Sequence, residues 1–220
     1  MPHLSAFLLY QFGLFVMVIW LKFHNPSSSA FMRSTLTQLQ AEQADARVIQ
    51  KWVPYDQISM NLKRAVVAAE DSRFINHGGV EWEAIQRAWE YNMRMSSERV
   101  RGGSTITQQL AKNLFLSSDR SYWRKAQELL LTFMIEAVLS KQRILELYLN
   151  IAQWGRNIFG AQAAAEYYFK RNADQLSATQ SARLAAMLPN PAYYDKRGNT
   201  RYLQSRTRTL LQRMRMVEVP

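Results

Sequence analysis

One stretch near the amino terminus limits the fold of this chain more than any other. Residues 4–21 carry no charged side chain and are mostly Leu, Phe, Val, Ile and Met. That length matches the apolar core of a bilayer, and Trp20 and Lys22 stand where interfacial residues are common. A signal peptide is the alternative, but the sequence has no basic leading segment and no clear small-residue cleavage site. We therefore predict one transmembrane anchor within residues 1–24.

The remainder of the chain is long enough to form one domain with a hydrophobic core. Because 48% of the residues are hydrophobic, a disordered body is excluded. We expect a linker and juxtamembrane segment over residues 25–50 and one domain over residues 51–220. Helical patterns extend over residues 56–70, 82–95, 105–115, 121–139, 141–155, 159–169, 177–188 and 200–216. Ser177 and Gln180 have the spacing of a capping box at the start of the 177–188 segment. No segment alternates like a strand, so the predicted fold class is mainly α.

The chain is strongly basic, with a formal net charge of +11. Such a charge predicts an acidic partner, which is a nucleic acid, an anionic lipid or a phosphorylated substrate. The absence of cysteine excludes disulfides and cysteine-ligated zinc, and the three histidines are too scattered for a metal cage. No zinc-finger or RNA-binding signature accompanies the charge.

Two adjacent carboxylates, Glu70 and Asp71, end one of the apolar helical segments. The negative end of a helix dipole disfavours a charged carboxylate, and partial burial adds to that effect. Both effects raise the pKa of Glu70, which suits a group that moves a proton near neutral pH. The alternative is that the two carboxylates only cap or brace the helix end.

A glycine pair, residues 102–103, precedes a second amphipathic segment. Thr105 and Gln108 have the spacing of a capping box, so a helix should begin there. Gln109 and Lys112 share a polar face with Thr105, and a helix amino terminus behind flexible glycines can bind an anion. Lys112 is too far from the glycines for a nucleotide-binding P-loop. An ordinary amphipathic helix with a solvated polar face is the alternative.

Arg124 and Lys125 stand about one helical turn before Glu128, a spacing that lets both pair with it. On a surface, such pairs contribute only about 0.3–0.5 kcal/mol. In a cleft, the same trio could hold a diphosphate beside a second working carboxylate, for which Glu136 is a weaker candidate. The arginines of residues 200–216 are either solvated or in contact with anionic head groups.

Five stretches, in order and with similar gaps, resemble the glycosyltransferase family that polymerises lipid II. That family includes the monofunctional peptidoglycan transglycosylases and the amino-terminal halves of bifunctional class A penicillin-binding proteins. The stretches are AEDSRFINHGG (69–79), RGGSTITQQLAKNLF (101–115), RKAQELLLTFMIE (124–136), KQRILELYLNIAQWG (141–155) and FGAQAAAEYYF (159–169). The resemblance runs from about residue 58 to residue 191 and includes the anchor. Because no penicillin-binding domain follows in the sequence, it favours the monofunctional type.

The resemblance implies a lysozyme-like helical globular domain with a small membrane-associated jaw, preceded by one amino-terminal transmembrane helix. It also implies an inverting peptidoglycan glycosyltransferase that joins lipid II into β-1,4-linked glycan strands and releases undecaprenyl diphosphate. Glu70 matches the general base, and Glu128 matches a second catalytic carboxylate at the departing diphosphate. The residues expected to bind substrate are Asp71, Phe74, His77, Ser104, Thr105, Gln108, Gln109, Lys112, Asn113, Arg124 and Lys125.

The resemblance further implies a divalent cation, Mg²⁺ or Mn²⁺, with Glu128 as its candidate ligand, and no organic cofactor. The expected partners are lipid II, the growing glycan, the bilayer and other cell-wall synthesis or division proteins, but no nucleic acid. The expected location is the inner membrane, with a single pass and a periplasmic catalytic domain. The basic residues Lys22 and Arg33 follow the span and none precedes it, which mildly favours a cytoplasmic body instead. A start upstream of Met1 would reconcile the two expectations.

Two other functions share some of these features. A membrane-anchored lysozyme-like lytic enzyme would also use a carboxylate in a helical domain, but its sugar leaving group needs no cationic set. A non-enzymatic binder of anionic lipid or nucleic acid would use the net charge, but it would not need Glu70 or the glycine pair.

Overall fold

Helices account for most of the computed structural model, which describes residues 2–94, 103–119 and 121–220. Within these ranges the α-helices follow the predicted order, which confirms the mainly α fold class. Their bounds are α1 (Pro2–Leu21), α2 (Ala30–Glu42), α3 (Met60–Glu70), α4 (Trp82–Arg94), α5 (Ile106–Phe115), α6 (Tyr122–Val138), α7 (Lys141–Ile151), α8 (Ala161–Phe169), α9 (Ala178–Met187), α10 (Pro191–Arg197) and α11 (Arg201–Arg213). The first glycine of the predicted pair, Gly102, and the end of the predicted 82–95 helix lie outside the described residues.

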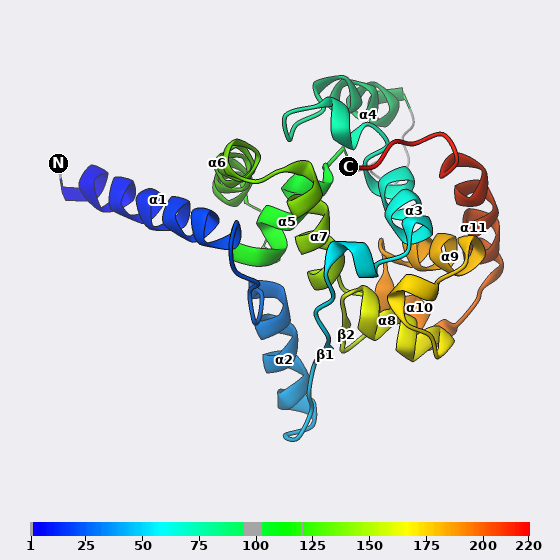
Figure 1. Cartoon of the computed structure of the whole chain (residues 1–220). Coiled ribbons are helices and arrows are strands. Elements are labelled where there is room, and N and C mark those ends of the chain that lie inside the picture. The colour runs from blue at the N-terminus through cyan, green and yellow to red at the C-terminus, as the bar shows by residue number, and fades with distance from the viewer. Residues whose placement is uncertain (1, 95–102, 120) are drawn as a thin grey trace.

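Helix α1 projects from one side of the molecule, and the globular body lies at its carboxyl-terminal end (Figure 1). Residues His3–Leu21 have a mean hydropathy of 2.1, and α1 is the one helix among the described residues that is long and apolar enough to cross a membrane. This agrees with the predicted single-pass anchor. Helix α2 then leads downward in the view of Figure 1, and the chain returns from its far end to the body.

The body consists of two groups of packed helices. Helix α9 packs against both α3 and α11, and α5 packs against both α6 and α7. The large, fully buried side chains include Trp154, Tyr148 and Phe74, which belong to one continuous hydrophobic core. The carboxyl end of α3 and the amino end of α5 come together where the two groups meet, which is where the predicted site residues lie.

Two very short strands, β1 (Ile49–Gln50) and β2 (Ile158–Phe159), form a parallel pair that the sequence analysis missed. Two residues are too few to show a strand alternation, and Phe159 was expected in a helix. Gly160 follows β2 with a φ of +84°, and a Cβ there would lie 2.5 Å from the carbonyl oxygen of Asn150. Only glycine permits this close return of the chain.

Helix boundaries depart from the sequence expectation in three places. Helix α3 begins at Met60 rather than at residue 56, because residues 55–57 form a 3₁₀ turn and the Ser59 hydroxyl caps the helix. Helix α7 ends at Ile151 rather than at residue 155, because the chain turns back so that Gly160 donates to the Ala152 carbonyl at 2.8 Å. Helix α10, which begins at Pro191, was not expected.

The predicted helix starts are otherwise confirmed. Thr105 with Gln108, and Ser177 with Gln180, each form a complete capping box, in which each residue's side chain accepts a backbone N–H of the other. The Ser121 hydroxyl caps α6. These local signals set where α5 and α6 begin and therefore which of their residues face the site.

Candidate active site

Glu70 is the last residue of α3 and lines a cavity of about 810 Å³. The chain leaves the helix at Asp71, so the Glu70 carboxylate stands at the helix end and is only partly buried. The Gln109 side-chain amide donates to Glu70 Oε2 at 2.8 Å. The Tyr148 hydroxyl donates to Gln109 Oε1 at 3.0 Å, which fixes the orientation of that amide. Glu70 is thus held by a chain of two hydrogen bonds that starts in the core.

Burial raises the pKa of the Glu70 carboxyl above its usual value of 4.5. The Gln109 hydrogen bond is the largest opposing effect, and the positive charges of Arg206 and Lys112 also favour the ionised form. The neighbouring Asp71 charge adds to the rise. The direction agrees with the expectation drawn from the helix end, although burial, and not the helix dipole, is the largest cause.

Asp71 is buried and joins two parts of the site. Its carboxylate accepts from His77 Nε2 at 2.7 Å and from the Ile106 backbone N–H, at the start of α5, at 3.1 Å. His77 Nδ1 accepts from the Gly79 N–H at 3.0 Å, so the proton of the neutral ring is on Nε2. Phe74 is fully buried with its ring edge-on to His77. Asp71 also lines the Glu70 cavity, whereas Phe74 and His77 support the Glu70 turn from behind.

Thr105 also supports the site rather than offering a free hydroxyl. It donates to the Gly79 carbonyl at 2.6 Å while it caps α5. Gly79 has a φ of +100°, and a Cβ there would lie 2.7 Å from Thr132 Cγ2 and 2.8 Å from Glu136 Cγ. Glu136 in turn accepts from Thr107 and Lys141, each at 2.7 Å, so it belongs to this structural network.

The predicted trio on α6 is assembled as expected. Arg124 Nη1 lies 3.2 Å from Glu128 Oε2, and Lys125 Nζ lies 2.6 Å from Glu128 Oε1. The Glu128 side chain is only 3% exposed, whereas that of Lys125 is 45% exposed. Glu128 is therefore buried beneath two cations, of which Lys125 reaches toward solvent and Arg124 is mostly buried.

The amine of Lys112 feels the charges of both carboxylates. Burial lowers its pKa, the charges of Arg124 and Lys125 lower it further, and the charges of Glu128 and Glu70 oppose that change. The charges of Glu70 and Glu128 therefore both act on this amine. Glu70 and Glu128 therefore belong to one charged region and do not lie on opposite surfaces.

A second cavity, of about 260 Å³, adjoins the Glu70 cavity. It is lined by Gln108 and Lys125, among others, and Gly103 and Ser104 line both cavities. The surface therefore continues from the Glu70 carboxylate across the start of α5 to the amine of Lys125. Asn113 is partly buried and lines neither cavity.

The surroundings of Glu128 do not form a divalent cation site by themselves. One carboxylate stands among three cations there, and both of its oxygens are paired, whereas Mg²⁺ and Mn²⁺ require several oxygen ligands. Asp71, His77 and Glu81 also place one ligand atom each within 4.8 Å of one another. The hydrogen bonds within the Asp71 turn, and the arginines that flank Glu81, account for that arrangement.

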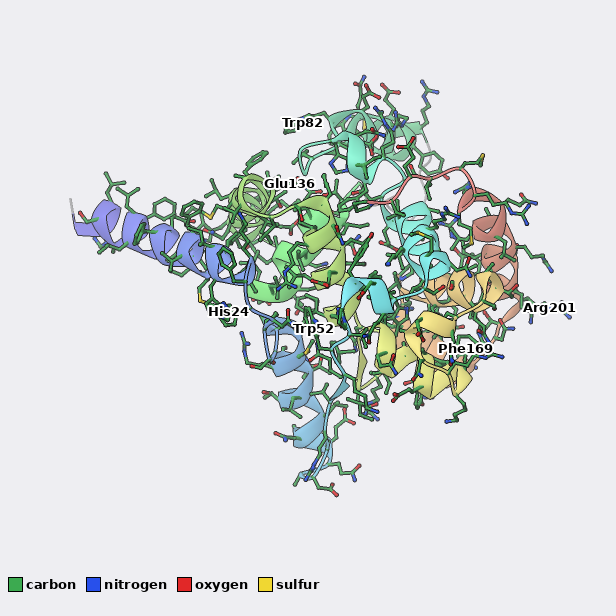
Figure 2. All side chains as sticks on the ribbon, in the orientation of Figure 1. His24, Trp52, Trp82, Glu136, Phe169 and Arg201 are labelled. Atoms are coloured by element: carbon green, nitrogen blue, oxygen red, sulfur yellow. The ribbon has the colours of Figure 1, made fainter. Side chains whose placement is uncertain are left out.

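The Glu70 cavity also contains residues that the sequence analysis did not select. Arg206 and Arg213 of α11 line it, together with Tyr202 and, from α4, Arg87. Arg201 lies on the opposite side of the molecule from α1 (Figure 2). Arg206 is half-buried and Arg213 is exposed, and both stand at the cavity that Glu70 lines. Tyr148 was also missed as a site residue, because its spacing assigns it to an apolar face.

The comparison with known proteins agrees with this geometry. A family model described as Transglycosylase matches residues 35–215. The biosynthetic peptidoglycan transglycosylase of Bordetella avium (strain 197N) is 58% identical over 223 residues, which cover 100% of this chain and 93% of that protein. The proteins of the same name from Methylobacillus flagellatus and Chromobacterium violaceum are 52% and 50% identical, covering 96% and 98% of this chain and 92% and 94% of their own lengths.

The fold and site define a mainly helical protein with one long apolar helix among its described residues and a carboxylate at a large cavity. With the family model matched over most of its length, the chain belongs to the transglycosylase family. Its helical body agrees with the lysozyme-like fold expected for that family.

Proposed function

We propose that this chain polymerises lipid II into β-1,4-linked glycan strands, with Glu70 as the general base. The observation that carries the proposal is the position of Glu70. Its carboxylate lines the large cavity and accepts a hydrogen bond from Gln109. The Glu70 charge and the charges of the Arg124–Lys125–Glu128 trio all act on the amine of Lys112. This arrangement places a proton acceptor beside fixed positive charge, which is what a sugar transfer with a diphosphate leaving group requires.

The proposed step is an inverting displacement. Glu70 accepts the proton of the acceptor sugar 4-hydroxyl as that oxygen bonds to the donor anomeric carbon. The bond from this carbon to the diphosphate oxygen breaks, and its electron pair leaves with the diphosphate. Lys112, Arg124 and Lys125 stabilise the charge that develops there, while Glu128 holds the latter two in position. Arg206 and Arg213 offer positive charge to the acceptor side of the same cavity.

We propose that the site works at the membrane surface and faces the periplasm. Helix α1 supplies the anchor. The exposed aromatic side chains of Trp82 and Trp89 on α4, and of Trp123 on α6, lie on helices that line or adjoin the smaller cavity. Trp82 stands at the outer surface of α4 (Figure 2). Such aromatic residues are typical of a membrane interface and would form the jaw.

We propose that any requirement for Mg²⁺ or Mn²⁺ arises with the substrate. The diphosphate would supply most of the oxygen ligands, since the residues around Glu128 supply only one carboxylate. No step of the displacement above depends on the metal. Adding a chelator to the polymerisation assay described next measures the requirement directly.

The test is polymerisation of lipid II by the purified full chain, with glycan strands separated on a gel. Glu70→Gln should lower the rate by about 10²- to 10⁴-fold, because the amide cannot accept the proton, while lipid II binding stays largely intact. Near wild-type synthesis by this variant would refute the assignment.

Loss of the fold would not explain that result. A carboxyl whose pKa is raised in the folded state contributes stability below its ordinary pKa and loses it as pH rises. Glu70→Gln should therefore melt at or above the wild-type temperature at pH 7.5, and that gain should vanish below about pH 4.5. Glu128→Gln should lose about 10²- to 10³-fold in rate, because the cations beside it lose their counter-charge. A mild effect would assign the leaving-group role to Lys112 and Arg124.

The lytic alternative does not account for three cations around a buried carboxylate. Incubation with finished cell wall instead of lipid II separates the two activities. Release of fragments from cell wall, without synthesis from lipid II, would overturn the proposal.

A further inference from the structure

The anchor helix contacts the body along a single stripe. The less exposed residues of α1 recur at spacings of three or four, and the other described residues of this helix are exposed. The stripe consists of Phe7, Gln11, Leu14, Val18 and Leu21. This is the spacing of a helix that packs on another helix, and α1 packs on α6. Helix α1 therefore contacts α6 through this one stripe, while the rest of its surface is exposed.

A pair of side-chain amides lies within this stripe. Gln11 Nε2 donates to Gln127 Oε1 at 2.7 Å, and Gln127 Nε2 donates back to Gln11 Oε1 at 3.0 Å. Gln127 is only 6% exposed. Two reciprocal hydrogen bonds fix both the rotation and the axial register of α1 against α6, which apolar contacts alone do not. An amide in an apolar span needs such a partner, because lipid offers none.

Two further contacts hold the same register. The Phe7 and Trp123 rings lie 5.9 Å apart one turn earlier on both helices. At the other end of α1, Arg143 Nε donates to the Leu21 carbonyl at 2.9 Å, and its Nη2 donates to the His24 carbonyl at 2.9 Å. The amide pair is thus the central of three attachment points.

We propose that Gln11 and Gln127 are positioning residues of the active site, and that they act by docking the anchor helix onto α6. Gln127 precedes Glu128, which holds Arg124 and Lys125. A fixed register of α1 on α6 therefore holds in place the turn of α6 that carries Glu128 and these two cations. This inference rests on the proposed role of Glu128, but the docking itself can be measured without any substrate.

Docking is tested first by cross-linking. The chain has no cysteine, so Phe7→Cys with Trp123→Cys introduces one unique pair. In vesicles of phosphatidylethanolamine and phosphatidylglycerol, a short bis-maleimide should link this pair rapidly. Adding Gln11→Leu or Gln127→Leu should slow linking by about three- to tenfold, the range of measured hydrogen bonds between membrane helices. The double Leu variant should also link slowly, because apolar contacts alone do not fix the register of α1 on α6.

Kinetics then separates positioning from a general loss of structure. In chains without the cysteines, each single Leu variant should raise the KM for lipid II about three- to tenfold and leave kcat within about twofold. Misfolding would instead lower kcat through a smaller active fraction. Tyr10→Leu is the matched control, since Tyr10 is the neighbouring residue and is 55% exposed. It should change neither the linking rate nor the KM.

Two results would overturn the inference. One is wild-type linking in both single variants, which would mean that the amide pair does not dock α1. The other is slower linking with an unchanged KM, which would mean that docking has no bearing on substrate. If Glu70→Gln polymerised lipid II normally, the proposed function would fail, while the linking rates would still decide the docking.

Discussion

At the Glu70 carboxylate, burial and hydrogen bonding act in opposite directions. Burial favours the protonated form, and the Gln109 amide favours the ionised form that a base requires. Tyr148 contributes indirectly. Its hydroxyl donates to the Gln109 carbonyl oxygen and so orients the amide N–H group toward Glu70. The pKa of Glu70 is therefore raised above its usual value, and the Gln109 hydrogen bond limits the rise.

We predict that Gln109→Leu moves the acidic limb of the pH profile of kcat/KM to higher pH. Burial raises the pKa of Glu70, and the Gln109 hydrogen bond lowers it. Without the amide the pKa therefore rises, and a higher pH is needed to ionise the carboxyl. Tyr148→Phe keeps the ring and should move the limb in the same direction but less. Profiles measured from pH 4 to pH 9 check both variants, and a limb that stays in place in Gln109→Leu contradicts the proposed hydrogen-bond effect.

Two adjacent glycines provide a matched test of the loop behind the site. Gly79→Ala should destabilise the protein by about 2–4 kcal/mol, because a positive φ and contacts under 3 Å to Thr132 and Glu136 both oppose a Cβ. Gly78→Ala should change stability by less than about 0.5 kcal/mol, since nothing lies within 4 Å of its Cβ position. Thermal unfolding of both variants in detergent measures the difference. Equal melting temperatures would show that the loop can shift to accommodate a Cβ at residue 79.

At the scale of elements, α5 carries the site residues and its start is fixed by a local cap. Thr105 closes the capping box and also binds the Gly79 carbonyl, so one side chain sets the helix start and joins it to the Glu70 turn. Helix α9 begins with the same kind of box at Ser177, away from the cavity that Glu70 lines. The two capping boxes have the same local structure. They differ because α5 carries residues of the candidate site and α9 does not.

We predict that Thr105→Ala and Ser177→Ala each destabilise the protein, by about 1 kcal/mol for the lost cap. Thr105→Ala should lose somewhat more, since the Gly79 carbonyl also loses a buried partner. Only Thr105→Ala should lower the polymerisation rate, because only α5 carries Gln109 and Lys112. Comparable rate losses in both variants would indicate that general stability, and not the position of α5, limits activity.

At the scale of the whole molecule, the site depends on segments far apart in the chain. Helix α11 packs on α9 and α3, which brings Arg206 to the cavity that Glu70 lines. The Arg206 charge favours the ionised form of Glu70. No local pattern in α11 distinguishes this arginine from the solvent-exposed ones on the same helix.

We predict that Arg206→Gln moves the acidic limb of the pH profile to higher pH, because the Glu70 pKa rises when the nearby positive charge is removed. Arg201→Gln, an exposed position on the same helix, should leave the profile unchanged. The same assay at low and high salt adds a check. The difference between wild type and Arg206→Gln should shrink as salt screens the charge. An unchanged profile in Arg206→Gln would remove this arginine from the site.

The amino-acid sequence by itself determined the long apolar amino-terminal helix, the order of the helices, the caps of α5 and α9, and the pairing of Arg124 and Lys125 with Glu128. These features depend on neighbours within four residues or on the length of an apolar run, so local spacing is sufficient to predict them. The tertiary structure alone decided that Asp71, Phe74 and His77 face inward, that Tyr148 and Arg206 serve Glu70, and that Gln11 meets Gln127. Each of these depends on which elements pack together, and helical periodicity states only that a face is buried, not what it is buried against.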